Sequence, residues 1–206
     1  VVEPLRVGRG GGVAAPADGA VAHQGLAHHR LPSLAMGAPL EGKVVLITGG
    51  ARRVGAGIAR RLHASGANLV VHYRSSAAEA RKLKDELAAA RAGSVVLVQG
   101  DLLKPANLSG LIKDALKGFG RLDALINNAS SFYATPIGEI TEKEWDDLVG
   151  TNLKAPLFLS QAAAPELRKN HGAIVNIVDI HAEFPMKGYV VYNVAKGALL
   201  ALTRSL

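Results

Sequence analysis

Residues 43–64 read KVVLITGGARRVGAGIARRLHA, and this stretch decides the fold. It opens with Val44 to Thr48, an apolar and β-branched run that is typical of a strand buried on both faces of a parallel sheet. Gly49 and Gly55 follow, and they allow the backbone to turn tightly before a helix begins. The stretch therefore predicts a strand, a glycine-rich turn and a helix whose first amides face an anionic group.

The same alternation of short apolar runs and longer helical segments continues along the chain. Strands are predicted at residues 44–48, 68–72, 94–99, 124–127 and 173–178. Helices are predicted near residues 55–65, 77–91, 105–119 and 142–170, with a last one from 189 to 206. These elements predict one α/β domain over residues 39–206, a doubly wound parallel sheet with helices on both faces. Because no strand follows the last helix, we expect the C-terminal strands of such a sheet to be missing.

Composition narrows the class of protein. The 206 residues are 49% hydrophobic with a formal net charge of +7, and basic and acidic side chains are interspersed, which favours a small anionic ligand over nucleic acid. The absence of cysteine excludes disulfides and thiolate metal sites, and the histidines lack ligand spacing, so no metal site is predicted. No apolar stretch is long enough to span a membrane, and we expect a soluble, cytoplasmic protein.

Residues 1–38 differ in composition from the rest of the chain. They are rich in Gly, Ala, Pro and His and show no apolar periodicity, so we expect a disordered, low-complexity leader. The presence of Arg and the scarcity of acids leave organellar targeting open. The alternative is an uncleaved or wrongly assigned leader ahead of Met36.

The end of the second predicted strand indicates which dinucleotide would bind. A sheet that holds NAD places an acidic residue near this point, where it binds the ribose 2′-hydroxyl. This chain has Tyr73, Arg74 and Ser75 instead, and their guanidinium and hydroxyl donors suit a 2′-phosphate. The sequence therefore predicts NADP, and a solvated surface arginine is the alternative.

Tyr192 and Lys196 lie four residues apart at the start of the last predicted helix, so their side chains share one face. An ammonium beside a phenol favours the phenolate, so we expect Lys196 to lower the pKa of Tyr192 toward the operating pH. Such a phenol can donate and accept the proton in the reduction of a carbonyl or imine. A solvated helix face is the alternative interpretation of this spacing.

A family resemblance is carried, in order along the chain, by Thr48-Gly49 with Gly55, Asp101, Asn127-Asn128-Ala129, Asn152 and Tyr192-x-x-x-Lys196. These motifs resemble the short-chain dehydrogenase/reductase family over about residues 40–206 and imply a Rossmann fold that binds NAD(P). The resemblance implies that Tyr192 is the catalytic acid, that Lys196 holds the nicotinamide ribose and that Asn152 supports a proton relay. The cofactor-binding residues that it implies are Gly49, Arg53, Val54, Gly55, Tyr73, Arg74, Ser75, Asp101, Leu102, Asn127, Ala129, Ser130, Tyr192 and Lys196.

Two departures from the common family pattern resemble pteridine reductases. Asp179 stands where the family usually has Ser, and Arg53 replaces a glycine of the first turn. The resemblance implies that Asp179 joins the catalytic group, and that Phe132 stacks on a flat pterin ring. The substrate-binding residues implied are Arg53, Ser130, Phe132, Asp179 and Tyr192. Alternatively, Phe132 is a core or loop aromatic and Asp179 caps the loop after the fifth strand.

Three functions are compatible with these residues. The first is hydride transfer from NADPH to a C=N bond of a small partner molecule, a pterin, dihydropterin or dihydrofolate. The second is reduction of a carbonyl substrate such as a 3-oxoacyl thioester, and the third is dinucleotide binding without turnover. Members of the family commonly pair through the long helix and the helix that holds the tyrosine, so the resemblance also implies a homodimer or homotetramer.

Overall fold

The computed structural model describes residues 39–206, and the leader expected at residues 1–38 lies outside the described residues. A parallel five-stranded sheet forms its centre, with the strand order β3-β2-β1-β4-β5. The strands are β1 (Val44–Ile47), β2 (Asn68–Tyr73), β3 (Val95–Gln99), β4 (Ala124–Asn127) and β5 (Ala173–Asn176). The chain moves outward from β1 to β3 and then returns to β4 on the other side of β1. The predicted doubly wound sheet is therefore confirmed.

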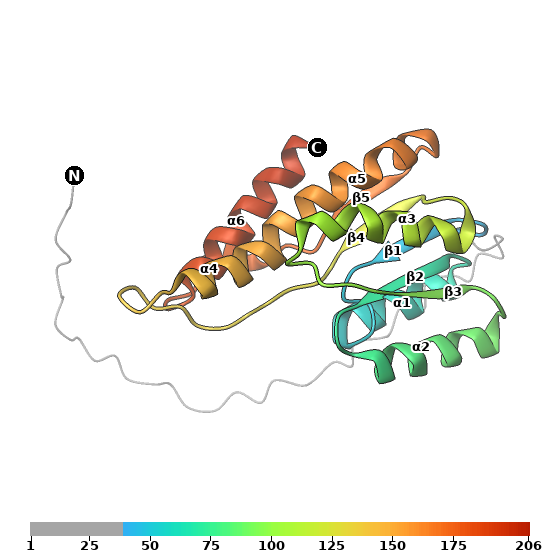
Figure 1. Ribbon diagram of the computed structural model, residues 1–206, viewed down its shortest axis with the longest axis horizontal. Helices are drawn as coiled ribbons and strands as arrows, with labels where there is room; N and C mark the ends of the chain where they lie inside the picture. Colours follow the sequence, from blue (N-terminus) through green and yellow to red (C-terminus); the bar gives the residue numbers. More distant parts are fainter. Residues whose placement is uncertain (1–38) are drawn as a thin grey trace, which may run out of the picture. The chain divides into compact units, whose positions relative to one another are not determined.

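Helices cover both faces of this sheet (Figure 1). They are α1 (Arg53–Ala64), α2 (Ala77–Ala90), α3 (Leu108–Phe119), α4 (Glu142–Val149), α5 (Ala155–Lys169) and α6 (Val190–Ser205), with short 3-10 turns at Pro105–Asn107 and Ile180–Ala182. α1 and α2 pack against one face, and α3 and α5 pack against the other. Among residues 39–206, none of the helices has the length and apolar character needed to cross a membrane.

β1 separates the two halves of the core because its side chains alternate between the faces of the sheet. Val44 and Leu46 pack with α3 and α5, while Val45 and Ile47 pack with α1 and α2. All four side chains are at most 3% exposed, as the uninterrupted apolar sequence predicts. Burial on both faces fixes β1 at the centre of the sheet, and the glycine-rich turn that follows it lies at the carboxyl edge.

The helix predicted over residues 142–170 is interrupted. The structure divides it into α4, a π-helical segment at Gly150–Lys154 and α5. Pro156 has no amide hydrogen to give to the carbonyl four residues earlier, which belongs to Asn152. In this segment the backbone hydrogen bonds span five residues instead of four, as in the bond from the Ala155 amide to the Gly150 carbonyl. Asn152 therefore lies in a π-helical turn, and the prediction of one regular helix was wrong at this point.

A carboxylate ties the opposite edge of the sheet together, at the start of β4. Asp123 accepts a hydrogen bond from the Val44 amide at 2.9 Å, and its oxygens lie 2.6 Å from the Arg121 guanidinium and 3.2 Å from the Lys43 ammonium. Burial disfavours the charged form, but these hydrogen bonds outweigh burial and hold the pKa of Asp123 below its ordinary value. Asp123 thus links the starts of β1 and β4.

Asp123→Ala is expected to lower the free energy of unfolding by about 3 kcal/mol, because it leaves the Val44 amide and two cations without their carboxylate. Asp123→Asn keeps an acceptor for the amide and is expected to lose about 1 kcal/mol. Urea unfolding at neutral pH measures both values, and equal losses would contradict the role of the charge. Because folding depresses this pKa, the stability due to Asp123 is present above a pH of about 4 and is lost as the pH falls through the folded pKa.

Candidate active site

A pocket of about 400 Å³ opens at the carboxyl ends of the parallel strands, where doubly wound sheets bind their ligands. Its walls come from the turn after β1, the ends of β2 and β3, the segments after β4 and β5, and α6. The predicted site residues that line it are Gly49, Arg53, Val54, Gly55, Tyr73, Arg74, Ser75, Asp101, Leu102, Ala129, Ser130, Asp179, Tyr192 and Lys196. Asn127, Phe132 and Asn152 do not belong to its lining.

The turn after β1 packs tightly against the segment after β4. The Thr48 hydroxyl accepts hydrogen bonds from the Asn128 and Ala129 amides. The Asn128 side chain donates in return to the Thr48 and Gly49 carbonyls. A Cβ atom on Gly55 would lie 2.3 Å from the Gly49 carbonyl oxygen, so no larger residue fits there. α1 therefore starts close against the turn, and its first residues line the pocket. The backbone amides of these residues have no acceptor within the helix.

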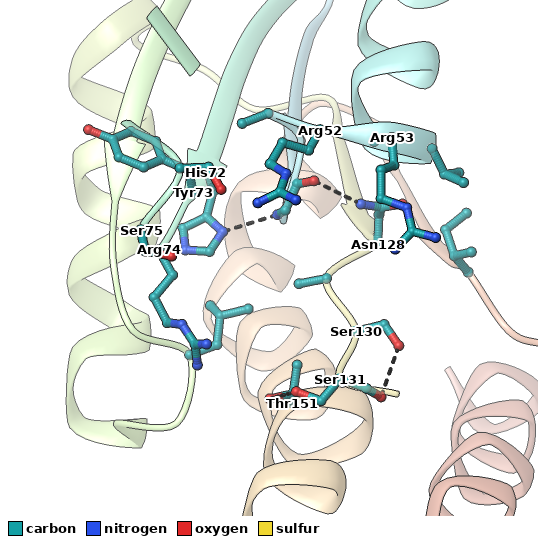
Figure 2. A pocket seen from close by; sticks show the side chains of 18 of the residues that line it. Arg52, Arg53, His72, Tyr73, Arg74, Ser75, Asn128, Ser130, Ser131 and Thr151 are labelled. Atoms are coloured by element: carbon teal, nitrogen blue, oxygen red, sulfur yellow. Dashed lines mark hydrogen bonds between the residues drawn. The ribbon is translucent and has the colours of Figure 1, made fainter. Parts of the chain in front are cut away.

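Arg53 has a φ of 49°, in the left-handed region. A side chain in this region costs roughly 1–2 kcal/mol, which explains why glycine is the usual residue at this point of the turn. The guanidinium projects from the start of α1 toward the pocket (Figure 2). Backbone strain that persists beside a pocket is a reason to look for a use of the side chain there.

Positive charge gathers at the end of β2. Arg74 lines the pocket there, and Arg52 reaches it from the turn before α1, on the other side of His72 (Figure 2). Arg52 lies 3.8 Å from the Glu79 carboxylate of α2, and both side chains are at least half exposed. Asp101, after β3, also lines the pocket and accepts a hydrogen bond from the Leu103 amide at 3.1 Å. The two guanidinium groups thus face the pocket from separate segments.

Tyr192, Lys196 and Asp179 meet at another part of the pocket. α6 presents Tyr192 and Lys196 one turn apart, and both residues are at most 4% exposed. The Tyr192 hydroxyl donates to the Asp179 carboxylate at 2.8 Å. The Lys196 ammonium donates to the Ile177 carbonyl at 2.9 Å and lies 5.7 Å from the centre of the Tyr192 ring. A phenol, a carboxylate and an ammonium are therefore held together by α6 and the segment after β5.

The electrostatics of this group correct the expectation that Lys196 lowers the pKa of Tyr192. Burial and the hydrogen bond to Asp179 raise the pKa of Tyr192 well above its ordinary value. Burial disfavours the Asp179 carboxylate, but hydrogen bonds from the His181 amide and the Tyr192 hydroxyl outweigh burial and lower its pKa. Burial lowers the pKa of Lys196. The expected direction was wrong because the carboxylate, and not the ammonium, contacts the phenol oxygen.

Asn152 lies behind the pocket wall, and all of its side-chain groups are bonded within the protein. Its carbonyl oxygen accepts from the Ser130 hydroxyl at 2.7 Å. Its amide donates to the Ser131 and Leu148 carbonyls, both at 2.9 Å. These bonds orient Ser130 at the pocket, while the part of Asn152 in a proton relay stays a prediction.

Asn127 and Phe132 lie beside the pocket and not in its lining. The Asn127 amide donates to the Asn176 side chain at 2.8 Å, and Asn127 is not part of the pocket lining. Its place beside a bound cofactor stays a prediction. Phe132 is 53% exposed and stacks on Tyr189 with 4.8 Å between ring centres. The Tyr192 ring meets Phe132 edge-on at 4.8 Å. Phe132 therefore stands next to the catalytic candidates as part of an aromatic cluster.

Sequence reasoning missed several residues that line the pocket, among them Arg52, His72, Leu103 and Thr151. The signal for Arg52 was a second positive charge beside Arg53, although the sequence does not show which of the two points inward. The signal for His72 was a polar ring inside an otherwise apolar strand. To use either signal, one must know whether a particular side chain points into the pocket, and the spacing of apolar residues in the sequence does not reveal this.

A family model described as short chain dehydrogenase matches residues 43–206. This match agrees with the parallel sheet, the glycine turn and the pairing of Tyr192 with Lys196. The chain therefore belongs to the short-chain dehydrogenase/reductase family, a family of oxidoreductases that bind nicotinamide dinucleotides.

Relatives in this family are mostly named as reductases. Pteridine reductase 1 of Leishmania tarentolae is 38% identical, over 79% of this chain and 69% of its own length. An uncharacterized oxidoreductase of Methylorubrum extorquens is 37% identical, over 80% of this chain and 65% of its own length. The hydroxynaphthalene reductase-like protein of Metarhizium anisopliae is 36% identical, over 81% of this chain and 62% of its own length. The chain thus spans about two thirds of these relatives, and the predicted resemblance to a pteridine reductase is confirmed.

Arg53→Gly is expected to raise the free energy of unfolding by roughly 0.5–1 kcal/mol, because glycine adopts the left-handed conformation without strain but loses more chain entropy on folding. Arg53→Ala keeps the strained backbone and is expected to change stability by less than about 0.5 kcal/mol. Urea unfolding of the two variants separates the backbone effect from the loss of the guanidinium. An equal gain in both variants would contradict the strain.

Proposed function

We propose that this protein is an NADPH-dependent reductase that transfers hydride to a C=N bond of a pterin, dihydropterin or dihydrofolate. The observation that carries the proposal is the 2.8 Å hydrogen bond from the Tyr192 hydroxyl to the Asp179 carboxylate at the pocket. This bond supports the proposal because a phenol that can give up a proton lies beside a carboxylate that can accept hydrogen bonds from substrate N–H groups. The similarity to a pteridine reductase supports the same substrate class.

The residues at the pocket fit a phosphorylated dinucleotide. Gly55 lets α1 start against the glycine turn, and the first amides of α1 are suited to a pyrophosphate. Arg52 and Arg74 bring two guanidinium groups to the place where a carboxylate would hold a plain ribose. This arrangement favours a 2′-phosphate. NADPH, when bound, supplies the hydride.

Tyr192 is assigned as the proton donor. A phenol is protonated at neutral pH, so the Tyr192 hydroxyl can give its proton to the substrate ring nitrogen as that nitrogen gains electrons. The raised pKa of Tyr192 in the free protein opposes this transfer, so the proton donor must be assisted by a group that favours the phenolate. Lys196 lies 5.7 Å from the ring centre and stabilises the phenolate that remains. Asp179 fixes the orientation of the hydroxyl, and the phenol and carboxylate titrate as a coupled pair.

Asp179 favours substrates that donate hydrogen bonds. An ionised carboxylate only accepts hydrogen bonds. A pterin edge presents an exocyclic amine and ring N–H groups that donate to it, whereas a ketone oxygen presents only lone pairs. We assign the remaining substrate contacts to Arg53, Ser130 and Phe132, with Phe132 as the stacking ring.

Reduction of a carbonyl substrate is the alternative. The name of the hydroxynaphthalene reductase-like relative, which matches 81% of this chain, points to a substrate class other than pterins. Tyr192 and Lys196 would serve a ketone as well as an imine, so these two residues do not decide between the reactions. The identity of residue 179 bears directly on the choice.

We also propose that the protein assembles as a homodimer or homotetramer, with residues 39–206 forming the dinucleotide-binding domain of each copy. Large apolar side chains are exposed on α4 and α5, among them Trp145, Leu157 and Phe158. Exposed apolar groups of this size are typical of surfaces that pair with another protein surface.

Purified protein is expected to oxidise NADPH with dihydrobiopterin or dihydrofolate and to leave a panel of ketones unreduced. Tyr192→Phe keeps the ring but removes the proton, so kcat is expected to fall at least about 100-fold while the Kd for NADPH changes less than about twofold. Asp179→Ser is expected to remove pterin turnover. Turnover of ketones alone would favour the carbonyl reductase, and dinucleotide binding without any turnover would favour a non-enzymatic function.

Arg74→Ala is expected to raise the Kd for NADPH roughly 10- to 100-fold, because a charged hydrogen bond to the 2′-phosphate is lost. The Kd for NADH, which has no 2′-phosphate, is expected to stay within about twofold. Arg81→Ala is the matched control, since Arg81 is exposed on α2 and lies outside the pocket lining. Fluorescence titration measures these constants, and similar losses for both dinucleotides would remove the NADP assignment.

A further inference from the structure

His72 is a buried histidine inside the apolar strand β2. It is 1% exposed and lies near the carboxyl end of the strand, where it contributes to the pocket lining. Both ring nitrogens are bonded: Nδ1 lies 3.2 Å from the Gly49 amide nitrogen, and Nε2 lies 3.1 Å from the Gly100 carbonyl oxygen. Figure 2 shows the ring beside the glycine turn, with a dashed line for the bond to that turn. One side chain therefore connects the turn after β1 with the end of β3.

The two partners fix the tautomer of the ring. Because the Gly49 amide can only donate, Nδ1 is the acceptor and carries no hydrogen. Because the Gly100 carbonyl can only accept, Nε2 carries the hydrogen and donates it. Burial lowers the pKa of His72 to about 4, so the ring is neutral at physiological pH, as this pattern of bonds requires.

The backbone of the same residue strengthens the connection. The Gly50 amide donates to the His72 carbonyl at 3.0 Å, so His72 binds two consecutive amides of the turn, one through its ring and one through its backbone. Gly49 has a φ of 60°, in the left-handed region. The ring thus holds the residue at which the chain changes direction.

We propose that His72 is a positioning residue for the dinucleotide: it occupies the Gly49 and Gly50 amides and leaves the first amides of α1 to bind the pyrophosphate. The inference rests on the proposed binding of NADPH. An amide that already donates to His72 has no second hydrogen for a phosphate oxygen. The first residues of α1 line the pocket, and their amides have no acceptor within the helix. His72 therefore selects the amides that face the anion and holds the turn from which they extend.

From the position of His72, we expect its substitution to change the affinity for the dinucleotide and not the rate of the catalysed step. Its bonds lie at the ends of β1, β2 and β3, whereas Tyr192 and Asp179 come from α6 and the segment after β5. The pyrophosphate is common to NADPH and NADH, while Arg74 is placed to distinguish them. A change at His72 is therefore expected to weaken both dinucleotides by the same factor and to leave kcat within about twofold.

Two variants test the two hydrogen bonds of the His72 ring one at a time. His72→Asn places an oxygen acceptor near the position of Nδ1 and keeps the bond to Gly49, whereas His72→Gln places an amide nitrogen near Nε2 and keeps only the bond to Gly100. His72→Gln is expected to raise the Kd for both dinucleotides about tenfold, and His72→Asn less than about threefold. Urea unfolding is expected to show similar losses of stability, because each variant loses one buried hydrogen bond.

A purely structural role predicts that affinity follows stability, so equal increases in Kd for the two variants, or none, would overturn the proposal. Nitrogen-15 NMR of the imidazole in the free protein is an independent test: a hydrogen on Nε2 supports the proposal, and a hydrogen on Nδ1 would overturn it without bearing on the proposed function. Failure of the unaltered protein to bind either dinucleotide would overturn the proposed function and this inference together.

Discussion

Close contact between two strand ends at the centre of the sheet is the constraint on which the site depends. A Cβ atom on Gly49 would lie 3.0 Å from the Ala129 Cα, so the turns after β1 and β4 are in contact along their backbones. The Thr48 hydroxyl accepts from two amides of the second turn, which have no strand partner there. Because β1 lies between β2 and β4, the chain leaves β1 and β4 toward opposite faces of the sheet. The pocket is the crevice that this divergence opens.

Desolvation then determines the protonation states at the other end of the pocket. Asp179 and Lys196 lie in the same buried neighbourhood, and each favours the charged form of the other. Tyr192 contacts the carboxylate directly, so its neutral form is favoured. For Lys196, burial and the charge of Asp179 shift the pKa in opposite directions, and burial outweighs the attraction. Tyr192 therefore holds its proton in the free protein.

The regular elements could be predicted because burial on both faces gives parallel strands an uninterrupted apolar sequence, as in β1. The π-helical turn around Asn152 could not, because Pro156 changes hydrogen bonding without changing the apolar pattern. The spacing of Tyr192 and Lys196 correctly placed both on one face of α6, but it does not show that the ammonium turns to the Ile177 carbonyl. Contacts made by residues distant in sequence, such as the bond from Tyr192 to Asp179, decide the pKa values.

The sequence left two interpretations of Asp179 as alternatives, a member of the catalytic group and a cap of the loop after β5, and the structure is compatible with both. One carboxylate oxygen accepts from the His181 amide at 3.0 Å and begins the turn at Ile180–Ala182, so the residue does cap the loop after β5. The other oxygen accepts from the Tyr192 hydroxyl. Each carboxylate oxygen has two lone pairs, so Asp179 can accept a substrate N–H without releasing either partner. A serine has one oxygen and a hydrogen to donate, which suits a ketone oxygen. The same position therefore caps the loop and binds the Tyr192 hydroxyl, and under the proposed function it also sets the polarity of the substrate.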